Sequence, residues 1–216
     1  MNDLDVQFIA VEGVIGVGKT SLAKRLAAML GGYALLEEVE ENPFLPDFYK
    51  DRRAYAFQTQ IFFLLSRYRQ QQRILQSDLF RRPIVSDYMF QKDSVFANIT
   101  LDDCELDMYN QIFSLMERGL PQPDRVIYLQ ASIEVLMARI EKRGRPYEAD
   151  MDPGYLETLA EAYTYFFSHY EGAPVLVVNT NDLNLEKNEK MVKDLYERLV
   201  QLRAGKAFFP ARGEFL

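Results

Sequence analysis

The 216-residue chain is poor in the residue types on which several kinds of functional site depend. It has one cysteine, Cys104, one histidine, His169, and no tryptophan. A single cysteine excludes a disulfide within the chain, and this pair cannot supply the four ligands of a Cys/His zinc site. We expect Cys104 and His169 to be ordinary packing or surface residues.

Long apolar runs are lacking as well. The first ten residues, MNDLDVQFIA, have neither the basic region nor the apolar core of a signal peptide. No stretch of the chain reaches the ~18 apolar residues of a membrane-spanning helix. These absences predict a cytoplasmic protein without a membrane partner.

Positive charge is in the minority. The chain has 25 Lys and Arg against 32 Asp and Glu, which gives a formal net charge of −7. Because a nucleic-acid backbone is bound by a basic surface, this composition predicts no nucleic-acid partner. Chemistry on phosphate groups must therefore rest on local clusters of basic residues. With 48% hydrophobic residues, a chain of this length suits one compact domain.

The chain does contain short apolar runs that alternate with helical patterns. Runs of strand length cover 8–12, 33–38, 83–87, 125–130 and 174–180. Residue spacing predicts helices after residue 18, in the middle of 47–82, from Ser132 to about Arg143, and around 153–170 and 185–204. Strands that alternate with helices indicate an α/β fold with a parallel sheet. The tail, from about 205 to 216, is predicted to be irregular.

The segment GVIGVGKTS, residues 13–21, follows the first apolar run and opens the first predicted helix. Glycines let backbone N–H groups approach phosphate oxygens, and a helix N-terminus adds partial positive charge. In this context the pattern predicts a P-loop that binds ATP through Gly13, Gly16, Gly18, Lys19, Thr20 and Ser21. The Lys19 ammonium would reach the outer phosphates, and the Thr20 hydroxyl would be a ligand of Mg²⁺.

Two classes of P-loop protein differ in where the phosphoryl group goes. A switch GTPase transfers it to water and carries an Asn-Lys-x-Asp segment, but the nearest match, NTND at 179–182, lacks the lysine. A small-molecule kinase transfers it to a bound hydroxyl under an arginine-rich lid. Arg139 and Arg143 lie four apart on one predicted helix, with Arg145 just beyond, and three guanidinium groups suit a charge-dispersed transition state. The same cluster could also be a solvated basic helix end.

Four segments together carry a family resemblance. They are EGVIGVGKT at 12–20, Asn-Pro-Phe-Leu with Phe-Tyr at 42–49, QIFFLLSRYR at 60–69 and RxxxRGR at 139–145. They resemble the deoxynucleoside kinases, and most closely the bacterial deoxyadenosine/deoxyguanosine kinase branch. The resemblance implies a P-loop kinase fold with a five-stranded parallel sheet flanked by helices, a lid over about 139–150, and a homodimer formed through two long helices.

The resemblance also implies a catalytic base. In the family, a glutamate at the end of the second strand, in a Glu-Pro-Val context, accepts the proton of the sugar 5′-hydroxyl. Glu37 stands in that place, and Glu38 is the alternative. A carboxylate there makes chemical sense because it orients the hydroxyl and takes its proton as the phosphoryl group arrives. We interpret the glutamates that follow, Glu40 and Glu41, as a solvated acidic run.

The end of the third predicted strand both matches the family and departs from it. Asp87 matches an acidic residue that helps to hold Mg²⁺ opposite Thr20. The next family position is an arginine that touches the base and the 5′-hydroxyl, but Tyr88 stands there. Either Lys92 or Arg52 could supply the missing cation.

The family reads the nucleobase with a glutamine on the long helix. Gln60 lies seven residues before Arg67, nearly two full turns, so the two share a helix face, whereas Gln58 points elsewhere. We therefore predict that Gln60 reads the base. Asp93 matches an aspartate that pairs with this arginine in relatives that accept purines or cytosine, although it could simply cap a helix. Phe96 would line the base pocket or pack in the core.

The same resemblance places three residues around the sugar. Tyr49 stands eleven residues before Gln60, where relatives have a tyrosine that binds the 3′-hydroxyl. Glu148, three residues past the last lid arginine, would be the second ligand of that hydroxyl, and Tyr155 matches a further family tyrosine. A 3′-hydroxyl clamped in a tight pocket favours deoxyribose over ribose.

The predicted function is ATP-dependent phosphorylation of a deoxynucleoside at its 5′-hydroxyl, with Mg²⁺ as the cofactor. Adenine, guanine and cytosine all remain candidates for the preferred base of the substrate. The resemblance favours the purines, and thymine is disfavoured. One alternative is a nucleoside monophosphate kinase of the thymidylate type, whose relatives usually carry an aspartate where Ile15 stands. A weaker alternative is a regulatory nucleotide switch without an acceptor.

Overall fold

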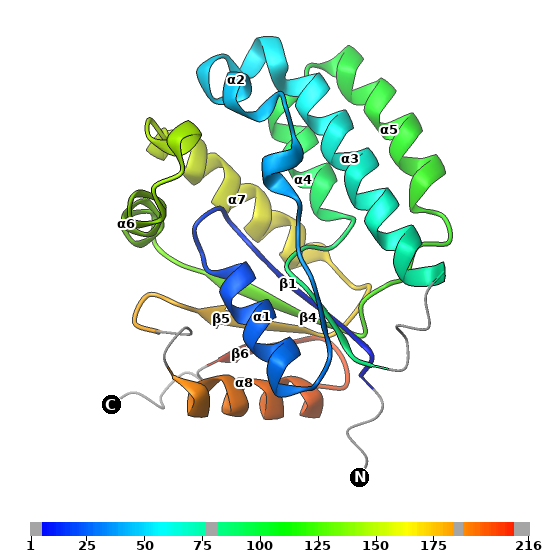
Figure 1. Ribbon diagram of the computed structural model, residues 1–216, viewed down its shortest axis with the longest axis vertical. Helices are drawn as coiled ribbons and strands as arrows, with labels where there is room; N and C mark the ends of the chain where they lie inside the picture. The colour runs from blue at the N-terminus through cyan, green and yellow to red at the C-terminus, as the bar shows by residue number, and fades with distance from the viewer. Residues whose placement is uncertain (1–5, 77–81, 184–187, 210–216) are drawn as a thin grey trace.

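A parallel sheet of six strands forms the centre of the protein (Figure 1). The computed structural model describes residues 6–76, 82–183 and 188–209. The strands are β1 (Phe8–Gly13), β2 (Tyr33–Leu35), β3 (Ile84–Ser86), β4 (Arg125–Gln130), β5 (Val175–Asn179) and β6 (Lys206–Phe209). Their order is β2-β3-β1-β4-β5-β6, and each neighbouring pair is parallel. The order places the end of β1 between the ends of β3 and β4.

The sixth strand corrects two predictions, the five-stranded sheet and the irregular tail. Residues 206–209 pair with β5, with Val175 opposite Lys206. β6 is a short edge strand whose side chains are exposed or half-buried, and Phe208 is exposed. A run of four residues that is only half-buried is too short to show the alternation that predicts a strand. The rest of the predicted tail, residues 210–216, lies outside the described residues.

Helices cover both faces of the sheet (Figure 1). They are α1 (Lys19–Met29), α2 (Leu45–Lys50), α3 (Arg52–Gln76), α4 (Lys92–Thr100), α5 (Asp103–Glu117), α6 (Ile133–Arg143), α7 (Pro153–His169) and α8 (Glu189–Gln201), with short 3₁₀ turns η2 (Val39–Glu41) and η4 (Pro146–Glu148). α1 and α8 pack on one face, and α7 packs on the other, where Phe167 stacks on Tyr128 of β4. α4 lies beside α7, while α3 and α5 lie farther out.

The predicted helix in 47–82 is present as α3, but α2 and α3 are separated at Asp51. Asp51 has non-helical backbone angles, and its carboxylate accepts a hydrogen bond from the Ala54 amide. An aspartate in this geometry caps the following helix. Neither proline nor glycine marks the break. The acidic cluster at 102–107 begins α5, where Asp102 and Glu105 form a capping box.

The ends of the other predicted helices are close to those observed. Ser132 is the N-cap position of α6, and Gly144 ends that helix with a positive φ of 69°. α8 begins at Glu189, and residues 185–187 of its predicted span lie outside the described residues. Within the described ranges, no helix is long and apolar enough to cross a membrane.

Candidate active site

A cavity opens where β1, β2 and β3 end, and the predicted site residues gather around it. Its described lining comes from the P-loop (Ile15, Gly16, Lys19, Thr20), the segment after β2 (Glu37, Val39, Leu45, Phe48, Tyr49), α3 (Thr59, Gln60, Phe63, Arg67), the β3–α4 region (Asp87, Lys92, Phe96) and the lid with α7 (Arg143, Arg145, Glu148, Tyr155). Strand ends in an open α/β sheet are the usual place for a ligand. One end of the cavity is therefore the P-loop, and the other is the face of α3.

The P-loop is packed so closely that two of its residues must be glycine. A Cβ on Gly13, whose φ is 142°, would lie 2.4 Å from the carbonyl oxygen of Leu129 in β4. A Cβ on Gly16, whose φ is 86°, would lie 2.8 Å from the side chain of Ile140 in α6. The loop therefore fits between the sheet and the helix that leads into the lid.

Lys19 folds back over the loop. Its ammonium donates to the carbonyl oxygens of Gly13 at 2.7 Å and Val14 at 3.2 Å. Burial, followed by the neighbouring charge of Lys92, lowers the pKa of Lys19 to about 8. A triphosphate bound in the loop would replace the two carbonyls as its partners.

Thr20 and Asp87 lie side by side at the start of α1 and after β3. The Thr20 hydroxyl donates to one carboxylate oxygen of Asp87, and the other accepts a 2.8 Å hydrogen bond from the Glu37 amide. Through these two hydrogen bonds, Asp87 connects the P-loop, the end of β3 and the predicted base. A hydroxyl and a carboxylate are both oxygen donors, the kind that Mg²⁺ prefers.

The carboxylate of Glu37 is held between two cations. Arg67 donates to Oε1 through Nε at 2.8 Å and also through Nη2, and the Lys92 ammonium donates to Oε2 at 2.7 Å. Burial alone would raise the pKa of Glu37, but the charges of Arg67 and Lys92 outweigh it and hold the pKa well below its usual range. The group is therefore ionised at neutral pH and available to accept a proton. Glu38 is not among the described residues that line the cavity.

The predicted base-reading residues form one buried cluster. Arg67 also forms an ion pair with Asp93, whose other carboxylate oxygen accepts a 3.0 Å hydrogen bond from the Tyr109 hydroxyl. Gln60 is 4% exposed and donates to the Asp93 carbonyl at 3.2 Å, whereas Gln58 is exposed. Of the two glutamines, Gln60, which shares a helix face with Arg67, is therefore the one that lines the cavity.

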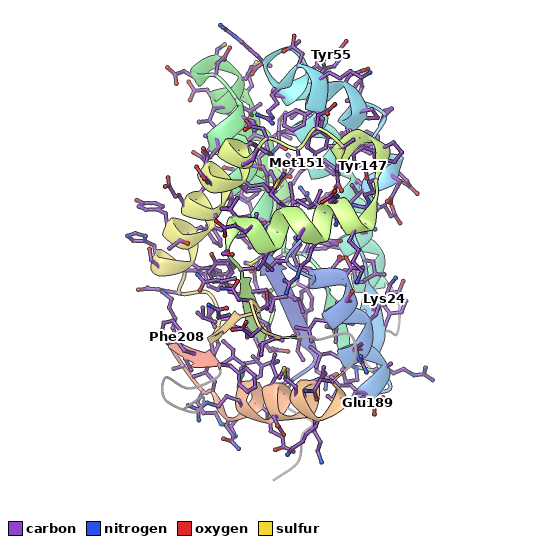
Figure 2. The ribbon with its side chains drawn as sticks, turned by 90° about the vertical axis from the view of Figure 1, so that its left-hand side faces the viewer. Lys24, Tyr55, Tyr147, Met151, Glu189 and Phe208 are labelled. Atoms are coloured by element: carbon purple, nitrogen blue, oxygen red, sulfur yellow. The ribbon has the colours of Figure 1, made fainter. Side chains whose placement is uncertain are left out.

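The lid arginines are paired with carboxylates. Arg143 binds both oxygens of Glu148, at 2.8 and 2.7 Å, and Arg145 lies 2.6 Å from Glu40. Arg145 also lies over the ring of Tyr147, which stacks on Tyr49. Figure 2 shows Tyr147 and Met151 between α6 and the ribbon of α2 and α3. The lid thus contacts the far wall of the cavity in this structure.

Arg139 departs from the predicted cluster. Its guanidinium donates to the hydroxyl of Thr180 at 2.9 Å and to the carbonyls of Thr180 and Val17. It is not among the described residues that line the cavity. Arg139 thus joins α6 to the P-loop and the end of β5, and its grouping with Arg143 and Arg145 as a catalytic residue stays a prediction.

The walls of the cavity that the predicted sugar and base residues form are aromatic. Tyr49 packs edge-on against Phe48, which packs edge-on against Tyr155. Phe96 packs edge-on against Tyr163 of α7. Burial raises the pKa of Tyr49 and of Tyr155, so both hydroxyls remain protonated donors at neutral pH.

Sequence reasoning missed several residues at the site. Glu12, the last but one residue of β1, is fully buried, and it accepts hydrogen bonds from the Met89 amide at 2.7 Å and the Tyr163 hydroxyl at 3.2 Å. Its only sequence signal is a charge inside an otherwise apolar strand. Thr59 lies in the lining beside Gln60. Glu40 is exposed, as predicted for the acidic run, and in addition pairs with Arg145.

Comparison with known proteins decides the family. The model of the deoxynucleoside kinase family matches residues 9–202. The chain belongs to the deoxynucleoside kinase family. Deoxyguanosine kinase of Bacillus subtilis (strain 168) is 39% identical over 196 residues, which cover 89% of this chain and 93% of the relative. Deoxyadenosine kinase of Dictyostelium discoideum is 37% identical, covering 91% and 82%.

Solved structures agree with this assignment. Deoxyadenosine kinase from M. mycoides with bound dATP superimposes with a TM-score of 0.77 at 27% identity, covering 88% of this chain and 99% of that one. The predicted family, α/β P-loop kinase fold and deoxynucleoside kinase activity are confirmed, apart from the number of strands. The kinase uses ATP to phosphorylate a deoxynucleoside, so its P-loop is not that of a switch.

Proposed function

We propose that this deoxynucleoside kinase acts on purine deoxynucleosides, with deoxycytidine as a further acceptor and thymidine disfavoured, and that Glu37 is its base. The observation that carries the proposal is the ionised carboxylate of Glu37, which lines the same cavity as Lys19 of the P-loop. Two relatives are named deoxyguanosine and deoxyadenosine kinase, and a third, from Bacillus subtilis, deoxyadenosine/deoxycytidine kinase. The buried pair of Arg67 and Asp93 supports this base preference.

The transfer needs no covalent intermediate with the protein. The 5′-hydroxyl gives its proton to Glu37 while its oxygen bonds to the γ-phosphorus of ATP. The bond from that phosphorus to the bridging oxygen breaks, and the electron pair leaves with ADP. Arg143 and Arg145, moving from Glu148 and Glu40 to the phosphoryl oxygens, stabilise charge that is dispersed in the transition state. Glu37 then returns the proton to solvent.

Thr20 and Asp87 would hold the Mg²⁺ that accompanies ATP. Mg²⁺ commonly takes one or two protein oxygens and completes its shell with phosphates and water, so a hydroxyl next to a carboxylate fits. A bound Mg²⁺ would neutralise charge on the β- and γ-phosphates. Asp87 additionally fixes the backbone of Glu37 through the amide hydrogen bond, which places the base relative to the metal site.

Tyr49 and Glu148 are proposed to bind the sugar 3′-hydroxyl, and Tyr155 to close the wall behind them. All three line the cavity, and Glu148 is buried with both oxygens on Arg143. The lid is proposed to span about 139–150. Its closure over the substrate would exclude water and limit ATP hydrolysis. We place the enzyme in the cytoplasm, where ATP is available, with no nucleic-acid partner.

A homodimer is proposed through the outer helices α3 and α5. Cys104, Met108, Gln111 and Leu115 recur every three or four residues and therefore share one face of α5. All four are exposed, with Met108 at 49% and Leu115 at 73%. Three of the four side chains are apolar, and an exposed, mostly apolar stripe on a helix is best explained by a partner that covers it.

The role of Glu37 is tested by Glu37→Gln, with Glu38→Gln as the matched control. The amide keeps the shape but cannot accept the proton, so kcat should fall by ~10²-fold while the KM for ATP changes little. Glu38→Gln should keep nearly full turnover. A small effect of Glu37→Gln together with a large effect of Glu38→Gln would move the base to Glu38.

Acceptor specificity is tested with the four deoxynucleosides and deoxyadenosine monophosphate under one set of conditions. The proposal expects the highest kcat/KM for a purine deoxynucleoside and the lowest among the four for thymidine. The monophosphate should be a poor acceptor, because the Glu37 carboxylate repels its phosphate. A preference for the monophosphate would instead indicate a thymidylate-type kinase.

A further inference from the structure

Tyr88, at the position where the family arginine is missing, cannot reach the reacting groups. Its side chain is fully buried in a small cluster with Phe8, Leu35 and Ile84, and it is absent from the described lining of the cavity. The hydroxyl donates to the Gln70 side chain at 2.8 Å. Tyr88 therefore packs between the sheet and α3 and leaves the neighbourhood of Glu37 without a cation from this position.

Arg52, one of the two candidate replacements, is engaged elsewhere. Its guanidinium forms an ion pair with Asp152 at 3.1 Å and lies 4.3 Å from the ring centre of Tyr155. It joins the start of α3 to the start of α7 and is not part of the described cavity wall.

Lys92, the first residue of α4, is the candidate that reaches Glu37. The residue is 4% exposed, and its ammonium donates to Oε2 at 2.7 Å. A lysine this deeply buried is rare unless it is paired. Two hydrogen bonds fix the turn that leads to this position. The Met89 amide donates to the Glu12 carboxylate, and the Lys92 amide donates to the Met89 carbonyl.

The hydrogen bonds around Glu37 leave one place for a substrate. Oε1 already accepts two hydrogen bonds from Arg67, whereas Oε2 accepts one, from Lys92. A carboxylate oxygen has about two lone-pair sites, so the open site is on Oε2. A hydroxyl that donates to Oε2 would lie beside the Lys92 ammonium, which has two further N–H donors.

We propose that Lys92 is the positioning residue that selects Oε2 of Glu37 as the proton acceptor, in place of the arginine that the family carries after the acidic residue. The inference rests on the proposed role of Glu37. Arg67 fixes one oxygen of the base and Lys92 the other, so the carboxylate plane is set before the substrate binds. The reacting hydroxyl then enters next to Lys92 and on the side away from Arg67.

The test compares Lys92→Met and Lys92→Arg with the surface control Lys24→Met. Lys92→Met keeps the apolar stem and removes the charge, so kcat should fall at least tenfold, while KM for ATP stays within threefold. Lys92→Arg restores a cation and should recover at least a third of kcat. Lys24 is exposed on α1, as Figure 2 shows, and its variant should behave as wild type. Thermal unfolding of each variant checks that the protein is folded.

A double-mutant cycle with Glu37→Gln separates positioning from a general structural effect. If Lys92 acts through Glu37, adding Lys92→Met to Glu37→Gln should lower kcat by less than threefold further. The inference would be overturned if the two substitutions lowered kcat in the double variant by the product of their separate effects. It would also be overturned if Lys92→Met alone kept kcat within threefold of wild type. A Glu37→Gln enzyme with normal turnover would instead refute the base assignment itself, so the two failures are distinguishable.

Discussion

At the scale of single residues, the site is an arrangement of buried charges that compensate one another. Arg67 is 4% exposed and lies between the carboxylates of Glu37 and Asp93. Removing one member of such a group leaves an uncompensated buried charge, which is strongly destabilising. For this reason the useful substitutions here keep shape and volume, such as Glu to Gln or Lys to Met.

Gln60 offers a test of base reading at this scale. Gln60→Ala removes a buried amide from the cavity wall, so KM for the deoxynucleoside should rise by about tenfold or more, in keeping with ~1–3 kcal/mol for an unpaired polar partner. Gln58→Ala is the matched control, because Gln58 is exposed on the same helix, and its KM should change by less than about twofold. Steady-state kinetics with saturating ATP measure both. Equal effects would show that Gln60 does not contact the base.

At the scale of secondary-structure elements, the lid is held by contacts that ATP must replace. Arg145 is paired at 2.6 Å with Glu40, whose side chain is 65% exposed, and lies farther, at 3.7 Å, from the buried Glu148, whereas Arg143 donates to both oxygens of Glu148 at 2.8 and 2.7 Å. Exposed ion pairs are worth only about 0–1 kcal/mol, so Arg145 is the arginine that can leave more easily. Under the proposed mechanism, Glu40 would compete with the phosphates of ATP for the same guanidinium.

Substituting Glu40 should therefore strengthen the binding of ATP. Glu40→Gln removes the competing charge, and the KM for ATP should fall by about two- to threefold with kcat little changed. Glu41→Gln, at the exposed neighbouring position, is the control and should leave KM unaltered. Initial-rate measurements at low salt are the suitable readout, because screening weakens this pair. A higher KM for Glu40→Gln would mean that the ion pair helps to form the ATP site.

How far the sequence predicts these elements depends on how local their signals are. Central strands such as β4 and β5 are buried on both faces, so their apolar runs predicted them directly. The break at Asp51 and the edge strand β6 depend on a cap and on pairing with β5, and neither leaves a strong pattern. The same distinction between local and long-range signals holds for the residues of the site. The P-loop is local, whereas the contacts of Arg139 with Thr180 and of Lys92 with Glu37 join residues that are 41 and 55 positions apart.

At the scale of the whole molecule, the cavity and the exposed stripe of α5 are connected through α3. Leu64 of α3 is buried in one cluster with Tyr109 of α5, and Tyr109 in turn donates to Asp93 beside Arg67. A partner that covers α5 would therefore also support the helix that carries Gln60 and Arg67. Dimerisation and the stability of the nucleoside pocket are expected to change together.

Leu115→Glu tests this connection. In a two-fold interface each substitution occurs twice, so the two introduced glutamates would be buried close to each other. Their repulsion should shift the protein from dimer to monomer. Light scattering coupled to gel filtration measures the mass, and the same sample should show a higher KM for the deoxynucleoside. Tyr165→Glu is the control, because Tyr165 is 71% exposed on α7, away from the stripe, and should leave the mass unchanged. A Leu115→Glu protein that remains dimeric, or a Tyr165→Glu protein that becomes monomeric, would place the interface on another face.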